Sequence, residues 1–141
     1  MKTAQDGLSL LLSGISDPGI ISVETLDYPF SYIEPLIKEL HLSVCLDAGH
    51  QVRYEHDLVQ TFEMHQSRIP LIHLHGVEGS KSEKKDHKAL DSFSEEEFGK
   101  VKAVLEPFRG VVSLEVFSLE NLNRSLRFLS GWFQDIPPEV Q

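Results

Sequence analysis

The chain has 141 residues, of which 40% are hydrophobic, so it can bury one core and is most simply a single domain over residues 1–141. It carries 13 Lys and Arg against 22 Asp and Glu, and the net charge of −9 disfavours DNA, RNA and anionic membranes as partners. The single cysteine, Cys45, excludes an internal disulfide. No signal-peptide pattern is present, and no apolar run approaches the roughly 20 residues of a membrane span. We therefore expect a cytoplasmic protein that acts on a small molecule.

Hydrophobic periodicity predicts helices that alternate with strands. A first helix over residues 3–13 and a turn at residues 17–19 make up a preceding segment, residues 1–18, and the core follows over residues 20–133. Strands are predicted at residues 20–24, 42–47, 71–75 and 111–116, and helices at 31–40, 57–69, 94–109 and 118–136. Three of these helix starts carry a capping pair: Ser31 with Glu34, Asp57 with Gln60, and Ser94 with Glu97. Residues 48–56 and 77–88 are predicted as loops.

One helix followed by four strand–helix units is typical of an α/β fold with a parallel sheet and right-handed crossovers. An open doubly wound sheet and part of a (β/α)₈ barrel both fit this order. No Gly-rich phosphate loop follows the first strand, which disfavours the dinucleotide-binding form of the open sheet. We predict four parallel strands and about five helices.

Each predicted strand has one aliphatic face and one face that ends in a carboxylate or imidazole. The members of the second face are Ser22 and Glu24, then Ser43, Cys45 and Asp47, then His73 and His75, then Ser113 and Glu115. Burying an unpaired carboxylate costs several kcal/mol, and one divalent cation would stabilise all four strand ends together. His50 can join them because it follows Asp47 by three residues, after the flexible Gly49. The pattern therefore predicts a metal site at the carboxyl edge of the sheet.

The polar segment after the third strand adds Asp86 and His87, which can approach the same edge. They are flanked by a basic cluster that is either a solvated loop or a clamp for a substrate phosphate: Lys81, Lys84, Lys85 and Lys88. His65 falls on the inner stripe of a predicted helix and is interpreted as a core histidine.

The strand ends resemble the C-terminal half of the xylose isomerase-like (AP endonuclease type 2) barrel superfamily, which includes the sugar phosphate isomerase/epimerase-like proteins. The matching segments are Val23-Glu24, Leu46-Asp47-Ala48-Gly49-His50, Ile72-His73-Leu74-His75-Gly76, Asp86-His87 and Leu114-Glu115. Within the superfamily, the chain is most similar to the cobamide-remodelling phosphodiesterases. The segments that carry this similarity are residues 23–29, 54–57, 73–77 and 86–90. The resemblance covers roughly residues 20–120.

The resemblance implies a bound divalent metal (Zn, Mn, Fe or Co) and a set of functional residues. The implied metal ligands are Glu24, Asp47, His50, His73, Asp86 and Glu115. Glu24, Glu115 and His75 would be catalytic, and His87, Lys85 and Arg53 would bind substrate. It also implies a (β/α)₈ barrel, which needs roughly 200 to 250 residues. This chain supplies four of the eight units, so we expect a homodimer or a complementary half-barrel partner.

The implied activity is hydrolysis of the phosphoester in the nucleotide loop of a cobamide, with the metal activating water and neutralising phosphoryl charge. A first alternative is a sugar or sugar-phosphate isomerase/epimerase, in which Glu24 and Glu115 move a proton. A second alternative is a non-catalytic half-barrel subunit or a truncated remnant. In the first two cases the substrate is a phosphorylated small molecule or a sugar.

Overall fold

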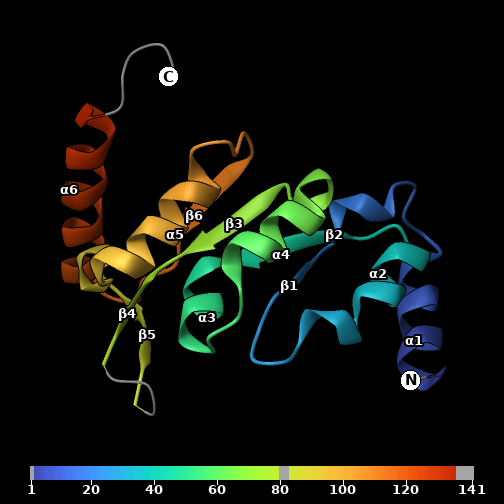
Figure 1. Cartoon of the computed structure of the whole chain (residues 1–141). Coiled ribbons are helices and arrows are strands. Elements are labelled where there is room, and N and C mark those ends of the chain that lie inside the picture. The colour runs from blue at the N-terminus through green and yellow to red at the C-terminus, as the bar shows by residue number, and fades with distance from the viewer. Residues whose placement is uncertain (1, 80–82, 136–141) are drawn as a thin grey trace.

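The computed structural model describes residues 2–79 and 83–135, and its centre is a four-stranded parallel sheet (Figure 1). The strands are β1 (Ser22–Glu24), β2 (Ser43–Asp47), β3 (Leu71–Leu74) and β6 (Val111–Leu114), in the order β1-β2-β3-β6. Every pairing in this sheet is parallel. This confirms the predicted α/β class built from consecutive parallel strand–helix units.

Six α-helices lie within the described residues, one more than predicted. They are α1 (Lys2–Leu12), α2 (Glu34–Glu39), α3 (Ala48–Arg53), α4 (Leu58–His65), α5 (Glu95–Leu105) and α6 (Leu119–Asp135). Short 3-10 helices η1 (Pro18–Ile20), η2 (Phe30–Tyr32), η3 (Gln66–Arg68) and η4 (Leu90–Ser92) complete the connections. Helices α4 and α5 lie side by side on one side of the sheet, whereas α1 and α6 stand at its opposite ends (Figure 1). None of the helices in the described part of the chain has both the length and the apolar character needed to cross a membrane.

The core lies between the aliphatic face of the sheet and the helices. Val44, Leu46, Ile72 and Leu74 on β2 and β3 have no exposed surface. They belong to one cluster with the inner residues of α4 and α5: Leu58, Phe62, Val101 and Val104. Burying each of the larger side chains contributes about 1.5–3 kcal/mol to stability. This packing sets the position of β2 and β3, whose carboxyl ends carry Asp47 and His73.

Two of the three predicted capping pairs are confirmed. The Ser94 hydroxyl and the Glu97 carboxylate form a reciprocal capping box on α5, and Asp57 Oδ1 accepts the Gln60 N–H at 3.0 Å. The prediction for Ser31 is wrong, because α2 begins at Glu34 without a side-chain cap. Pro35 has no N–H to donate to the carbonyl of Ser31, so a helix through both residues would lose that bond.

The two predicted loops contain regular structure instead. Helix α3 begins directly after β2 because the Asp47 side chain accepts the His50 N–H at 2.7 Å. Six residues are too few to show an amphipathic period in the sequence. The second loop holds an antiparallel hairpin of β4 (Gly76–Glu78) and β5 (Lys85–Lys88), which brings Asp86 and His87 back over the sheet edge. Lys81 lies outside the described residues.

Candidate metal centre

Four side chains from the four parallel strands meet at the carboxyl edge of the sheet. Glu24 and Asp47 end β1 and β2, His73 lies in β3, and Glu115 follows β6. Asp47 is in register with His73, and the Glu115 N–H continues the ladder to the Leu74 carbonyl. One ligand atom of each side chain lies within 4.8 Å of those of the others. We call these four residues the carboxylate cluster. It contains the three carboxylates that strand parity predicted and, of the two histidines on the same predicted face, His73 rather than His75.

The His73 imidazole lies between the three carboxylates. Its Nδ1 is 3.1 Å from Glu24 Oε1, 3.2 Å from Glu115 Oε2 and 4.0 Å from Asp47 Oδ2. Three carboxylates therefore surround a group that carries at most one positive charge. Because the Asp47 side chain has 0% exposure, its charge receives little stabilisation from water.

Two buried oxygens of the carboxylate cluster make no aligned hydrogen bond among the described residues, although each lies 3.2 Å from an imidazole nitrogen. Asp47 Oδ2 and Glu115 Oε2 are buried, and neither makes a hydrogen bond to any described residue. Buried oxygens of this kind cost several kcal/mol unless a donor or a cation compensates them. Carboxylate oxygens with an imidazole nitrogen are also the mixed O/N donor set that first-row divalent metals accept. The residues present thus fit a divalent cation.

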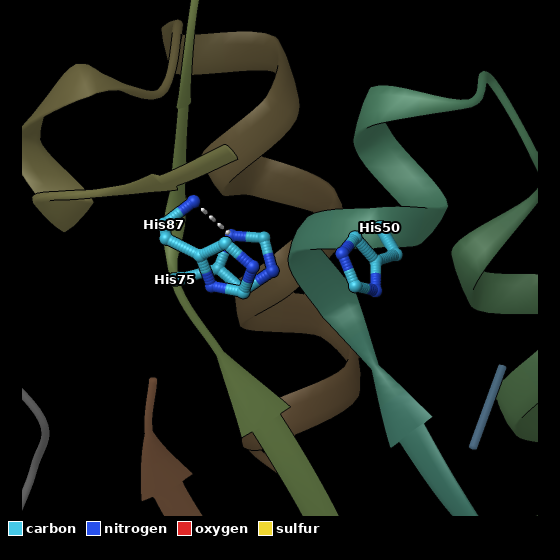
Figure 2. Close-up of side chains that lie close together, drawn as sticks. All are labelled: His50, His75 and His87. Carbon is cyan, nitrogen blue, oxygen red and sulfur yellow. Dashed lines mark hydrogen bonds between the residues drawn. The ribbon is translucent and has the colours of Figure 1, made fainter. Parts of the chain in front are cut away.

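A second group of possible ligands lies beside the first and consists of three imidazoles, which we call the histidine cluster (Figure 2). His50 comes from the first turn of α3, His75 follows β3, and His87 lies in β5. The ring centroids of His75 and His87 are 4.3 Å apart, and that of His50 is 5.0 Å from His75. The β4–β5 hairpin creates this cluster, because it carries His87 back to the sheet edge.

His50 touches carboxylates on both sides. Its Nδ1 is 3.2 Å from Asp47 Oδ2, and its Nε2 is 3.5 Å from Asp86 Oδ2. Burial lowers the pKa of His50, against the opposing effect of the Asp47 charge. A lowered pKa keeps the ring neutral at pH 7, which is the form that binds a metal.

Asp86 forms an ion pair with Arg53. It belongs to neither ligand cluster, although its Oδ2 lies 3.5 Å from His50 Nε2. The Arg53 guanidinium also lies over the Tyr54 ring, 5.2 Å from its centroid. Arg53 is therefore at the predicted site, but its charge is balanced by Asp86 in this structure.

The basic residues of the hairpin have separate positions. Lys85 is exposed on β5. Lys84 is held by the Val52 carbonyl at 3.1 Å and by Glu97 at 3.0 Å, and Lys88 is 3.7 Å from Glu78. The described lysines thus do not converge on one point as a phosphate clamp would require.

His75 and His87 are joined by the contact drawn in Figure 2, in which the His87 backbone N–H donates to His75 Nδ1 at 3.0 Å. His75 is fully buried, and its Nε2 lies 3.1 Å from Asp47 Oδ1. Burial acts to raise the pKa of Asp47, but the close polar contact and charge interaction with His75, then the His50 N–H, lower that pKa overall. Asp47 is consequently ionised at neutral pH, as a metal ligand must be.

Two features of this site escaped prediction from the sequence. His87 adopts a left-handed backbone with a φ of 53°, and its ring stacks on Phe117 at a centroid distance of 4.2 Å. No local pattern signals either feature, because both depend on how the hairpin meets the segment after β6.

Cys45 lies on the same sheet face but is not a candidate ligand. Burial, followed by the charges of Glu24 and Asp47, raises the pKa of its thiol to about 12. A thiol that remains protonated at pH 7 is a poor nucleophile, and Cys45 belongs to neither ligand cluster.

Comparison of the chain with family models, with curated proteins and with solved structures found no match.

Proposed function

We propose that this chain is a divalent-metal-dependent hydrolase of the xylose isomerase-like superfamily, and more specifically a phosphodiesterase that acts on the nucleotide loop of a cobamide. The observation that carries the metal dependence is the carboxylate cluster, whose Asp47 and Glu115 each have one buried oxygen without a hydrogen bond among the described residues. A bound divalent metal would activate water and neutralise charge on the phosphoryl oxygens. The mixed oxygen and nitrogen donors suit Zn, Mn, Fe or Co.

The three carboxylates of the cluster differ in solvent exposure, which suggests different roles for them. Asp47 is fully buried and can act only as a ligand, whereas Glu24 and Glu115 are 33% and 31% exposed. A partly exposed carboxylate at the metal can both bind it and exchange a proton with water or substrate. Glu24 and Glu115 are therefore our candidates for proton transfer.

The proposed preference for a phosphoester is supported by Arg53 and His87 at the site, and Lys85 lies exposed on the hairpin that carries His87. Arg53 is 30% exposed and Lys85 is exposed, so both can turn toward a phosphate. His87 Nδ1 lies 3.0 Å from the Glu115 carbonyl, which it can reach only as an N–H donor, and this leaves its Nε2 for substrate. The choice of a cobamide rests on the resemblance alone.

The proposal includes a second copy of the chain that completes a barrel. Within the described residues, β1 and β6 each have a strand partner on one side only. Val111 on β6 is 64% exposed, and Phe117 and Leu119 beyond it are exposed too. Ile20 and Leu10 are exposed at the β1 end. Pairing each β6 with the β1 of the other copy would bury both edges and give eight strands.

One observation favours the isomerase or epimerase alternative. Glu24 and Glu115 approach the same His73 nitrogen at 3.1 and 3.2 Å, so two carboxylates face one position. Such a pair can remove a proton from one carbon and return it to a neighbour. Deuterium uptake from heavy water into a sugar phosphate, without phosphate ester cleavage, would identify this activity.

The test of the hydrolase combines binding with turnover. The purified chain is titrated with Mn²⁺, Co²⁺, Zn²⁺ and Fe²⁺ by calorimetry, and is then incubated with a cobamide while cleavage is followed by mass spectrometry. We expect at least about one metal ion bound per chain and a dimer by sedimentation. The Glu24→Gln variant should lose cleavage activity. A metal-free monomer without cleavage activity contradicts the proposal. His65→Gln is the matched control, because His65 is a buried histidine on α4, outside both clusters.

A further inference from the structure

We propose that His75 is a positioning residue, whose Nε2–H holds one oxygen of Asp47 so that the other oxygen faces the metal. The inference rests on the proposed metal site and deepens it. It gives His75 a role different from the direct catalytic one predicted from the sequence.

The first step is the tautomer of His75. A backbone N–H can only donate, and that of His87 lies 3.0 Å from His75 Nδ1. Nδ1 must then present its lone pair, so the proton of the neutral ring resides on Nε2. The Gly76 carbonyl oxygen, 3.2 Å from Nδ1, is an acceptor and competes for this nitrogen only in the opposite tautomer. The fixed proton of the His87 amide decides between the two.

The second step is the partner of Nε2. It lies 3.1 Å from Asp47 Oδ1, in a bent contact, and it makes no aligned hydrogen bond to any described residue. His75 has no exposed surface, so water does not solvate this N–H. Asp47 Oδ1 is therefore the group that stabilises it, by a charge-assisted interaction.

The third step is that the two oxygens of the Asp47 carboxylate have different neighbours. Oδ1 receives the His50 backbone N–H at 2.7 Å and faces Nε2 of His75. Oδ2 makes no aligned hydrogen bond among the described residues. It lies 3.2 Å from His50 Nδ1 and 4.0 Å from His73 Nδ1, so it faces two of the predicted metal ligands. With Oδ1 held by the His50 backbone N–H and facing His75, the carboxylate can rotate little, and Oδ2 remains on the side of His50 and His73.

The surroundings of His75 support a fixed ring. A Cβ atom on Gly49 would overlap the imidazole, so the ring lies directly against the backbone of α3. His87 has a left-handed backbone, with its ring held by Phe117 and by the Glu115 carbonyl. A non-glycine residue in that conformation needs such support, and here the conformation aims the amide N–H at Nδ1. A continuous chain of contacts thus joins Glu115 to His87, His75 and Asp47.

The same contacts exclude a site with three imidazole ligands. Both nitrogens of His75 face protein groups, so His75 has no lone pair to offer in this tautomer. The histidine cluster of Figure 2 is then two accessible imidazoles and one positioning imidazole.

The experiment uses the full chain with four variants at two buried histidines. Gln at position 75 keeps an N–H near the place of Nε2, whereas Asn keeps only an acceptor near the place of Nδ1.

We expect His75→Asn to weaken Mn²⁺ or Co²⁺ binding by about 10–100-fold, the usual effect of losing a partner of a metal ligand. His75→Gln should stay within about 3-fold of the wild type. His65→Asn and His65→Gln control for the loss of any buried histidine, and should leave the affinity unchanged. Equal losses in His75→Gln and His75→Asn would mean that only ring packing matters and would overturn the proposal.

A second measurement does not depend on metal. Long-range ¹H–¹⁵N spectra of the metal-free chain report which ring nitrogen is protonated, and we expect His75 to carry its proton on Nε2. A proton on Nδ1 would overturn the inference even if the metal site is real. A wild-type chain that binds no metal but shows the Nε2–H tautomer would overturn the proposed function and leave the hydrogen-bonded chain intact.

Discussion

The two clusters of possible ligands lie side by side at the carboxyl edge of the sheet, yet they differ in what surrounds their donor atoms. In the carboxylate cluster, two buried oxygens have no hydrogen bond among the described residues. In the histidine cluster, His75 Nδ1 accepts a backbone N–H and His87 Nδ1 faces a carbonyl. His50 Nδ1 and His75 Nε2 make no aligned hydrogen bond, but both lie against the Asp47 carboxylate. A collection of ligand-type residues is therefore not in itself a metal site. The deciding property is whether their lone pairs are already engaged by the protein.

The largest effect should come from Asp47, because it belongs to one cluster and contacts the other. Asp47→Asn keeps an N-cap for α3 but removes the charge, and we expect metal affinity to fall more than about 100-fold while stability changes little. Asp47→Ala should lose the same affinity and in addition about 1 kcal/mol of stability with the cap. Calorimetric metal titration and chemical denaturation separate the two effects. Unchanged metal binding in Asp47→Asn would place the metal elsewhere.

Substituting one histidine in each cluster tests whether the metal binds at the carboxylate cluster or at the histidine cluster. His73→Leu removes the nitrogen that three carboxylates approach, and we expect metal affinity to fall by about 100-fold. His87→Leu keeps the backbone N–H on His75, so metal affinity should fall less than 10-fold while cleavage slows more. Metal titration and turnover are measured on both variants. A stronger loss of affinity in His87→Leu would reverse the roles of the two clusters.

Gly49→Ala tests the link between the clusters through packing. The added methyl group would overlap the His75 ring, so we expect the ring to shift, metal affinity to fall by about 10-fold and stability to drop by about 1–3 kcal/mol. Gly99→Ala in α5 is the matched control, since its Cβ meets nothing within 4 Å and should stabilise the helix by about 0.5–1 kcal/mol. Thermal unfolding with and without metal measures both. Normal metal binding in Gly49→Ala would show that the ring position is unimportant.

The smallest effect concerns His65, a buried histidine outside both clusters. Burial lowers its pKa, partly offset by Glu34, so the unfolded chain binds more protons than the folded one as pH falls. Stability linked to His65 is therefore fully present above the unfolded pKa of about 6.5 and is lost as pH falls below it. His65→Gln should reduce this acid sensitivity, as measured by denaturation between pH 7.5 and 5. An unchanged slope would assign the acid sensitivity to other groups.

Much of the fold was predictable because it follows from local patterns. Alternation along β2 and β3 separates Val44, Leu46, Ile72 and Leu74 from the polar face, and all four are buried as expected. The hairpin was not predictable, since its strands are short and polar and are held by Gly76, where a Cβ would overlap the Ala89 carbonyl. His65 is buried on α4, as its place on the inner stripe predicted.

The sequence by itself determined the carboxylate cluster. Side chains alternate strictly along a strand, and parallel strands in register end at one edge, so Glu24, Asp47 and Glu115 had to meet one of the two histidines, His73 or His75, once the sheet formed. Only the tertiary structure decided what surrounds His75. Its tautomer depends on a backbone N–H delivered by His87 from a hairpin, in a left-handed conformation that no local pattern encodes. Hydrogen-bond direction is set by where two distant segments meet, and that is a property of the folded chain.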